Sequence, residues 1–354
     1  MSVTRIAEKA GVSIATVSRV LNNSRPVNPK IAEMVRRAME ELQLPPRQLR
    51  RRARSRSGDR NATIAIVSVG QGYRGWFELP VIASVVAELT RAAQELHMGV
   101  LMAEMPDPNQ LSPVLRRPEV DGALVFISSD LTTKATTVLR EQLPVVRVMG
   151  GQLAPVEIDH IGPDNNAIGY VAGQYLLQQG LHKLAYLTCK PVWDFSKLRA
   201  QGFMAAAQDA GITPTMYLQQ GEQPVPVGFY GPRVVAERDL STLIARLREG
   251  KKERLGLFVS RDEEAVHAYR VMREAGLEPG TDVVVVSCDN EIVRLSTLHP
   301  RPASIDLGAS EIARYAVRRL AQRIKHQDEP PARILVNPRL VVDEIPANLD
   351  YSGF

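Results

Sequence analysis

The chain has 354 residues, of which 44% are hydrophobic and 23% charged, and these proportions are typical of a folded globular protein. No run of 18 apolar residues is present, which excludes a membrane-spanning helix, and the first residues lack the apolar stretch of a signal peptide. Only two cysteines occur, Cys189 and Cys288, which excludes a disulfide framework or zinc site and predicts two small buried residues. We therefore expect a cytoplasmic protein of two to three domains.

The net charge of +5 divides unevenly along the chain. Residues 1–60 carry 14 lysines and arginines against five acidic residues, so their net charge is +9. The remainder has a net charge of −4. A basic head on a mildly acidic body predicts a module that binds a polyanion, joined to a part with another task.

The head shows the pattern of three short helices. Apolar residues at helical spacing follow Ser2, then Ser13, then the Asn28–Pro29 pair, and all three sites are typical helix starts. Gly11 supplies the positive φ that a tight turn between the first two helices requires. This order is that of a helix-turn-helix, whose second helix can enter the DNA major groove.

The second helix offers an exposed face for DNA. Arg19 can bond a guanine edge or a phosphate, whereas Ile14 and Ala15 can make only apolar contacts, for example to thymine methyl groups. Short polar groups suited to phosphate oxygens complete the candidate set: Ser13, Thr16, Ser18 and Asn22. Taken singly, each of these is an ordinary cap or surface residue, and only the ordered set points to DNA.

The run AGVSIATVSRVLN resembles the signature of the LacI/GalR family of bacterial transcription regulators. The resemblance implies that Ile14, Ala15 and Arg19 occupy the base-reading positions. Arg5 departs from the family pattern, which has an acid there, and removes a favourable charge from the first helical turn.

The following segment, residues 47–61, matches the family least. The family has a hinge helix there, with an Asn cap and a leucine that wedges into the minor groove; those positions are Arg47 and Ala53 in this chain. Losing the wedge weakens unstacking of a base step, although Leu49 can replace it if the helix sits one turn differently. Arginines that neutralise phosphates, Arg50 and Arg51 among them, predict an electrostatic hinge that kinks DNA weakly; the alternative is a plain basic linker.

From residue 62 onward short apolar runs alternate with helical segments, as in ATIAIVSV, DGALVFI, LAYLT, LGLFVS and VVVVSCDN. This alternation predicts parallel sheets built from βαβ units and covered on both faces. Helices are expected near 79–98, 132–142, 164–180, 197–210, 236–249 and 262–275. A ligand site is expected between the two subdomains, in the cleft at the carboxyl ends of their strands.

The family resemblance extends through this body, in segments such as PDNNAIGYVAGQYL and FVSRDEEAVHAYRVMREAGL. It implies an all-α helix-turn-helix domain (1–46), a hinge (47–61) and an α/β periplasmic-binding-protein-like body (62–354) of two doubly wound parallel-sheet subdomains. The first subdomain is expected over about 62–160 and 291–325. The second is expected over about 161–290 and 326–354.

The resemblance also implies effector contacts. Arg199 matches the arginine that family members point at the ligand, and Asp289 follows a strand, where its carboxylate can accept from sugar hydroxyls. Arg261 stands where the family often has Asn and adds a cation. Asp164 and Asp262 are interpreted first as helix N-caps.

Two tryptophans fall in loops after strands and can stack on a sugar ring or pack under a loop: Trp76, with Tyr73 beside it, and Trp193. Two arginines near the cleft mildly favour an anionic or polyhydroxylated ligand. No metal spacing, cofactor fingerprint or catalytic triad is recognised, so no cofactor is expected.

These observations predict a ligand-responsive repressor and not an enzyme. We expect a homodimer on double-stranded, pseudo-palindromic operator DNA, controlled by a sugar-like small molecule. One alternative is a sugar-binding or catalytic α/β protein with an incidental basic head. Another is a nonspecific architectural DNA binder, suggested by the arginine-rich hinge.

Overall fold

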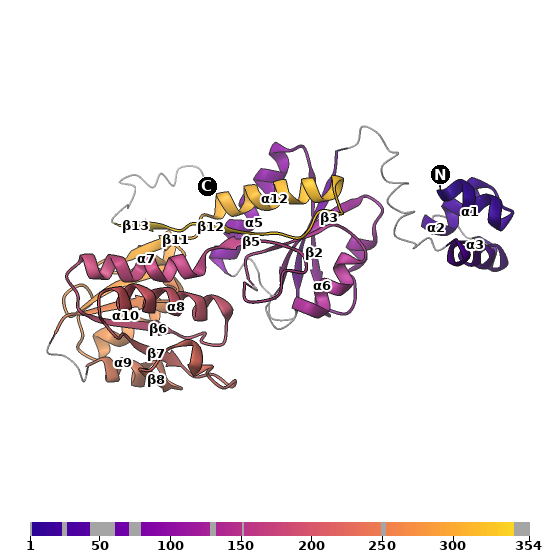
Figure 1. Ribbon diagram of the computed structural model, residues 1–354. Coiled ribbons are helices and arrows are strands. Elements are labelled where there is room, and N and C mark those ends of the chain that lie inside the picture. Colours follow the sequence, from indigo (N-terminus) through magenta and orange to yellow (C-terminus); the bar gives the residue numbers. More distant parts are fainter. Residues whose placement is uncertain are drawn as a thin grey trace.

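The computed structural model describes residues 2–22, 27–42, 61–70, 79–127, 132–150, 152–248 and 253–342. Figure 1 shows the three-helix head in indigo, followed along the chain by the two subdomains of the body. The predictions for the hinge residues Arg47–Ala53 and for Tyr73 and Trp76 lie outside these ranges.

The head consists of helices α1 (Ser2–Ala10), α2 (Ile14–Asn22) and α3 (Pro29–Glu41). They pack around fully buried Ile6, Val17 and Val35, one from each helix. Gly11 has a φ of 64°, as the tight turn between α1 and α2 requires. The side chain of Asn28 accepts a hydrogen bond from the Lys30 amide at 2.9 Å, which confirms the predicted start of α3. The predicted helix-turn-helix is therefore present.

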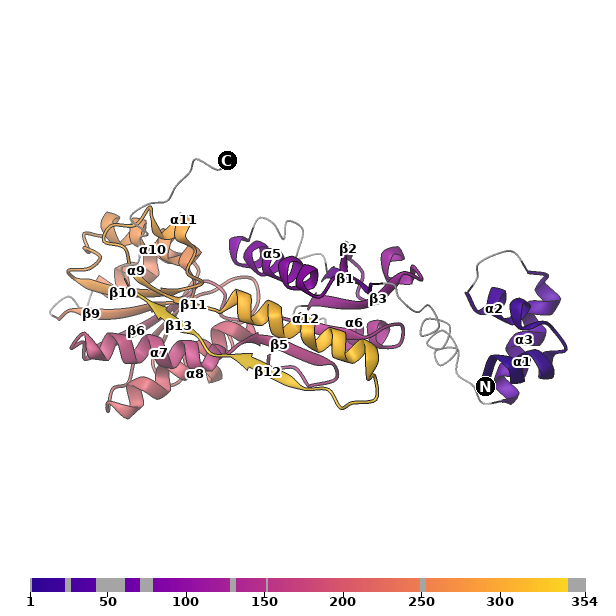
Figure 2. The same ribbon diagram turned by 90° about the horizontal axis from the view of Figure 1, so that it is seen from above.

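The first subdomain is built on a six-stranded sheet in the order β12-β5-β4-β3-β1-β2, in which every pair is parallel. Alternate residues of its strands face opposite sides, and helices α5 and α12 cover one side, where they lie next to each other in Figures 1 and 2. Helix α6 and the one-turn helix Pro113–Arg116 cover the other side. The elements are β1 (Thr63–Val69), α5 (Pro80–Glu95), β2 (Gly99–Met105), β3 (Val120–Ile127), α6 (Thr132–Arg140), β4 (Val145–Val148), β5 (Asp159–Pro163), α12 (Ala309–Lys325) and β12 (Arg333–Val336).

The second subdomain has a seven-stranded sheet in the order β13-β11-β10-β9-β6-β7-β8, and only the β11–β13 pair is antiparallel. Helices α7 and α8 pack on one face, while α9 and α10 pack on the other. The elements are α7 (Asn165–Gln178), β6 (Lys183–Thr188), α8 (Asp194–Asp209), β7 (Thr215–Gln219), β8 (Val234–Glu237), α9 (Leu240–Arg248), β9 (Leu255–Val259), α10 (Asp262–Glu274), β10 (Val283–Cys288), α11 (Ile292–Leu295), β11 (Ala303–Asp306) and β13 (Arg339–Val341), with a one-turn helix at Val227–Phe229.

Two details of the predicted layout were wrong. The helix expected over 236–249 begins only at Leu240, because β8 pairs with β7 as far as Glu237 and the Asp239 carboxylate then accepts from the Thr242 amide at 3.1 Å. The subdomain boundaries after residue 290 also differ: β11 joins the second sheet and β12 the first. Such short strands carry no sequence mark of the sheet to which they pair.

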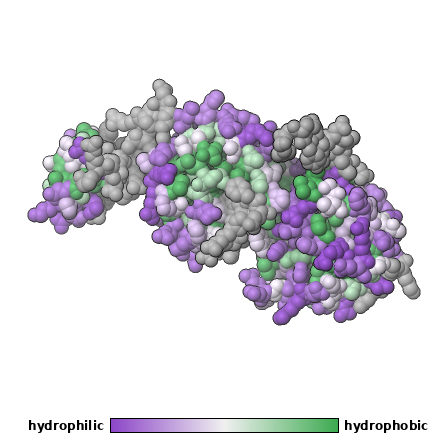
Figure 3. Space-filling view, turned by 180° about the vertical axis from the view of Figure 1, so that it is seen from behind, coloured by the Kyte–Doolittle hydropathy of each residue, from purple (hydrophilic) through white to green (hydrophobic). Residues whose placement is uncertain are grey.

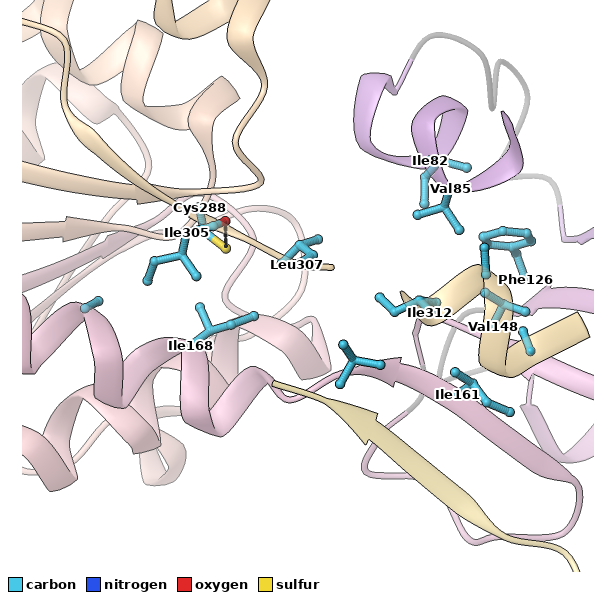
Figure 4. Packing of buried hydrophobic residues seen from close by; sticks show 14 of the residues in the cluster. Ile82, Val85, Phe126, Val148, Ile161, Ile168, Cys288, Ile305, Leu307 and Ile312 are labelled. Carbon is cyan, nitrogen blue, oxygen red and sulfur yellow. Dashed lines mark hydrogen bonds between the residues drawn. The ribbon is translucent and has the colours of Figure 1, made fainter. Parts of the chain in front are cut away.

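The chain passes between the subdomains where β5 leads into α7, β11 into α12, and β12 into β13. Figure 4 shows Leu307 at the second passage, between Ile305 of one sheet and Ile312 of α12. At the opposite end of β5 from the first passage, the buried Asp159 carboxylate binds Arg319 Nε at 2.9 Å and Arg323 Nε at 2.7 Å, both on α12. It also accepts from the Ala332 amide at 2.8 Å, so one side chain fastens α12 and the start of β12 to β5.

Candidate DNA-reading helix and effector pocket

Helix α2 presents the predicted reading residues at its surface. Ser13 Oγ accepts the Thr16 amide at 3.1 Å, which caps the helix as predicted. Ile14 is 52% exposed although it is apolar, and Ala15 and Arg19 are also exposed. Thr16 is half-buried and hydrogen-bonds Ser13 at 2.8 Å, while the side chains of Ser18 and Asn22 lie outside the description. An exposed isoleucine beside an exposed arginine is a surface suited to base edges.

Close contact between two helices positions Arg199. Helices α7 and α8 meet at Gly169 and Gly202; a Cβ at either glycine would lie 1.8 Å from a carbonyl oxygen, that of Arg199 and that of Asn166 respectively. No residue larger than glycine fits this approach without moving a helix. The glycines therefore bring the α8 backbone at Arg199 against α7.

The Arg199 guanidinium is buried and fully engaged within the protein. Its Nε donates to Asn165 Oδ1 at 3.0 Å, one terminal nitrogen donates to the Ser260 carbonyl, and the other lies 3.5 Å from Asp289 Oδ1. The Phe195 ring lies beneath it, with the guanidinium carbon 5.1 Å from the ring centroid. The fold thus brings the predicted pair Arg199 and Asp289 together.

Asp289 follows β10 with a φ of 111°, a conformation that side chains other than glycine rarely adopt. Its side chain is only 5% exposed. Burial raises the pKa of this carboxyl group, while the nearby Arg199 and Arg261 charges lower it. Such strain at a strand end, on a buried carboxylate, is typical of functional sites.

Asp262 is not the N-cap that we expected. Arg261 occupies the cap position, and Asp262 is fully buried inside the first turn of α10. Its carboxylate accepts from Ser287 Oγ at 2.5 Å, Ser304 Oγ at 2.8 Å and the Glu291 amide at 2.7 Å. It therefore joins α10 to β10, β11 and the loop after β10. Asp164 does cap α7, accepting from the Asn166 and Ala167 amides at 3.0 Å each.

A pocket of about 330 Å³ opens where β6, β7, β8 and β9 end and where α9 and α10 begin. Arg261, for which an effector contact is predicted, lines this pocket, and so does Cys189, which is half-buried rather than buried as expected. Arg261 pairs with Glu263, so the cation that it adds is compensated. The remaining lining residues are Lys190, Gln219, Asp239, Leu240, Ser241, Glu263, Glu264, His267, Arg270 and Val271.

Sequence reasoning missed Glu264 in this lining. The signal was present, because Glu264 lies one turn before Ala268 and two turns before Val271, on the buried stripe of α10. A glutamate in that stripe needs an explanation. Trp193, in contrast, is 40% exposed, packs edge-on against Phe195 at 5.7 Å between ring centroids, and is not among the pocket residues.

Two hydrogen bonds, one of them buried, link the subdomains beside Arg199. Gln152, in the loop between β4 and β5, accepts a hydrogen bond from Asn165 Nδ2 at 2.9 Å. The amide of Leu153 donates to Asp194 at the start of α8 at 3.2 Å. A hydrogen-bonded path therefore runs from the first subdomain through Asn165 and Arg199 to Asp289.

In the part of the chain that the structure describes, no helix is long and apolar enough to cross a membrane. Over the same residues, no group of three or more His, Cys, Asp or Glu side chains is arranged to hold a metal ion.

Comparison with family models gives three matches. Residues 3–46 match bacterial regulatory proteins of the lacI family. Residues 75–224 match the periplasmic binding proteins and sugar binding domain of the LacI family, and residues 174–343 match a periplasmic binding protein-like domain. Together the three models cover the head and both subdomains.

Similar proteins match along nearly their whole length. The ribose operon repressor of Haemophilus influenzae and the transcriptional regulator CelR of Thermobifida fusca are each 27% identical, covering 96% of this chain and 96% of theirs. The transcriptional repressor PurR of Mannheimia succiniciproducens is 26% identical over 95% of this chain and 96% of its own.

Solved structures agree in fold. A complex of the transcriptional regulator CelR with cellobiose has a TM-score of 0.62 at 22% identity, covering 97% of this chain and 98% of the other. The Lac repressor dimer bound to operator and the anti-inducer ONPF has a TM-score of 0.58 at 21% identity, with the same coverage. With its helix-turn-helix head, its two-subdomain body and these matches along the whole chain, the protein belongs to the lacI family of bacterial transcription regulators.

Proposed function

We propose that this protein is an operator-binding repressor that responds to a neutral, polyhydroxylated small molecule held in the pocket at Arg261. The observation that carries the proposal is the combination, in one chain, of a capped reading helix with exposed Ile14 and Arg19 and a polar pocket at strand carboxyl ends. The relatives named for ribose repression and the neighbour bound to cellobiose support a sugar-like effector.

Charge compensation favours a neutral effector over an anionic one. Arg199 faces Asp289, and Arg261 faces Glu263, so neither guanidinium supplies an unbalanced positive charge to the pocket. Lys190 and Arg270 lie exposed at the rim. The idea that two cleft arginines attract an anion therefore loses its support from the structure.

Control of DNA binding follows from linkage. A ligand that binds one arrangement of the two subdomains better than another shifts the population toward it by its differential binding free energy. The contacts Gln152–Asn165 and Leu153–Asp194 are made between the subdomains next to the Arg199 cluster. We infer that closure changes these contacts and that the change alters the spacing of two heads on the operator.

Two DNA-binding heads on one operator require a homodimer. The first subdomain has a surface that suits pairing with a second copy of the chain. Strand β2 is the end strand of its sheet, so one of its edges is unpaired by the strands described. Leu96, just before it, and Met102 within it are 42% and 45% exposed. Figure 3 shows an apolar area, in green, on the body surface. Exposed apolar side chains on an end strand favour pairing with a second copy.

The test uses the full chain. Selection of binding sites from random duplex DNA is expected to yield a pseudo-palindrome, and Arg19→Ala is expected to weaken binding to it by about ten- to a hundredfold, the value of one bidentate base contact. Equal affinity for random duplexes across a salt series would establish the nonspecific binder instead. A neutral sugar that raises the thermal midpoint and changes operator affinity supports the effector role.

A further inference from the structure

Glu264 is a buried carboxylate with few hydrogen-bond donors around it. It lies in the first turn of α10, is 3% exposed and lines the pocket. Within the part of the chain that the structure describes, no contact to either carboxylate oxygen has full hydrogen-bond geometry, and the Cys189 amide is the backbone donor that acts on its charge. A buried carboxylate with so few donors is destabilising, because the protein does not fully replace the water that the charge has lost.

The nearby cations are committed elsewhere. Arg199 donates to Asn165, Ser260 and Asp289, and the terminal nitrogen of Arg261 pairs with Glu263. The charges of both arginines still act on Glu264, since each lowers its pKa. Neither arginine, however, hydrogen-bonds the Glu264 carboxylate, so beside the Cys189 amide it has room to accept from a group outside the protein.

The neighbouring guanidinium of Arg261 has an unused hydrogen-bond donor. Arg261 Nε is buried and donates to no acceptor in the described residues, and Arg261 lines the same pocket as Glu264. An acceptor on Glu264 and a donor on Arg261 therefore lie buried in the wall of the same pocket, each with hydrogen-bonding capacity left over. A hydroxyl group, which donates and accepts at once, matches both roles. An ammonium group only donates, and a carboxylate only accepts.

We propose that Glu264 is a specificity-determining residue of the effector pocket, whose carboxylate accepts a hydrogen bond from a hydroxyl group of a neutral polyol while Arg261 donates to the same region of the ligand. This inference rests on the effector function proposed above and adds to it the chemical group that is read. Ligands that present a carboxylate or a phosphate at this position are rejected by the Glu264 charge.

The ionisation of Glu264 supports this assignment. Burial raises its pKa to about 7; Arg261, the Cys189 amide and Arg199 lower it, and Asp289 raises it. The Cys189 thiol and the phenols of Tyr186 and Tyr230 also sense its charge, which raises the pKa of each. A hydroxyl that donates to the carboxylate favours its ionised form. Ligand binding near pH 7 is therefore expected to release a proton from the protein.

The first experiment compares ligands on the full chain. Thermal midpoints and calorimetric affinities are measured with the neutral sugars D-ribose, D-glucose and cellobiose, the cationic D-glucosamine and the anionic D-glucuronate. The proteins are the unchanged chain, Glu264→Gln, and the control Glu278→Gln, which removes an exposed carboxylate from the loop after α10, away from the pocket residues. We expect a neutral sugar to bind best, and we expect Glu264→Gln to weaken its binding about ten- to a hundredfold, as for a lost hydrogen bond to a charged group. Glu278→Gln should leave the affinity for the sugar unchanged.

The possible outcomes distinguish the role of Glu264 from the effector function on which it rests. Equal binding of the neutral sugar to the unchanged chain and to Glu264→Gln would leave the effector function standing and overturn the role of Glu264. Preference of the unchanged chain for glucosamine or glucuronate would overturn the hydroxyl assignment. If no compound raises the thermal midpoint of the unchanged chain or binds it in calorimetry, the proposed effector function itself fails.

A second experiment needs no ligand. Glu264→Leu removes the buried carboxylate, so at pH 8 its thermal midpoint should lie above that of the unchanged chain, and the gap should narrow at pH 5.5, where Glu264 is protonated. A midpoint below that of the unchanged chain at pH 8 would show that the protein itself satisfies Glu264, and would overturn the inference.

Discussion

The sharpest structural prediction concerns the contact of α7 with α8. In Gly169→Ala the new Cβ would lie 1.8 Å from the Arg199 carbonyl oxygen, 2.7 Å from its carbon and 2.8 Å from the Phe203 nitrogen. All three are backbone atoms, so no side chain can turn aside. Ordinary contact needs roughly 3.5 Å, and the helices must therefore separate by about 1.5 Å or more.

The cost follows from what that separation disturbs. Overpacking a core typically costs about 1–3 kcal/mol and sometimes more, whereas alanine gains about 1 kcal/mol over glycine inside a helix. Because the clash is with backbone on both sides, we expect a net loss of about 3 kcal/mol. For a body of this size that lowers the thermal midpoint by roughly 5–10 °C. Ligand binding should weaken as well, since the displaced carbonyl belongs to Arg199.

The assay is thermal unfolding followed by circular dichroism, with Gly221→Ala as the matched control. A Cβ at Gly221 meets nothing within 4 Å, and its φ is not in the left-handed region. Gly202→Ala, whose Cβ would lie 1.8 Å from the Asn166 oxygen, should behave like Gly169→Ala. If Gly169→Ala unfolds within about 1 °C of the control, the helices yield without strain and the reasoning is refuted.

Three further predictions test the cap of α2, the Asp159 ion pairs of the first subdomain and the buried Glu264. Ser13→Ala removes the acceptor for the Thr16 amide and should destabilise the head by about 1 kcal/mol, seen as faster amide exchange in α2; unchanged exchange would contradict it. Asp159→Asn should cost about 3 kcal/mol in urea unfolding, because the buried Arg323 loses its counter-charge and the half-buried Arg319 keeps only Glu329, whereas a loss below about 1 kcal/mol would show that Arg323 finds another partner. Burial raises the pKa of Glu264 to about 7, so between about pH 4.5 and 7 the folded chain retains a proton that the unfolded chain releases. The free energy of unfolding should therefore fall as the pH rises through this range. If Glu264→Gln shows the same pH dependence, another group causes it.

The sequence by itself determined the features that depend on local rules. The turn glycine, the Ser13 cap and the Asn28–Pro29 start act within a few residues, and each is present as predicted. The alternation of apolar runs with helical segments likewise determined two parallel sheets, because strands buried on both faces must be apolar throughout. The pairing of Arg199 with Asp289 was also within reach, since both positions were carried by the family resemblance.

Only the tertiary structure decided how charges and short strands are shared. Asp262 was read as a local cap, but its partners Ser287 and Ser304 come from strands that the fold brings beside α10. Two arginines mildly favoured an anionic or polyhydroxylated ligand, and only folding placed a carboxylate against each of them. The same reason explains why β11 and β12 belong to the opposite sheets from those predicted. The sheet that a four-residue strand joins depends on the neighbouring strand that completes its hydrogen bonds, and that strand is distant in sequence. Glu264 combines the two cases. Its place on the apolar stripe of α10 was visible in the sequence, whereas only the packing of the folded chain determined how few hydrogen bonds its carboxylate makes.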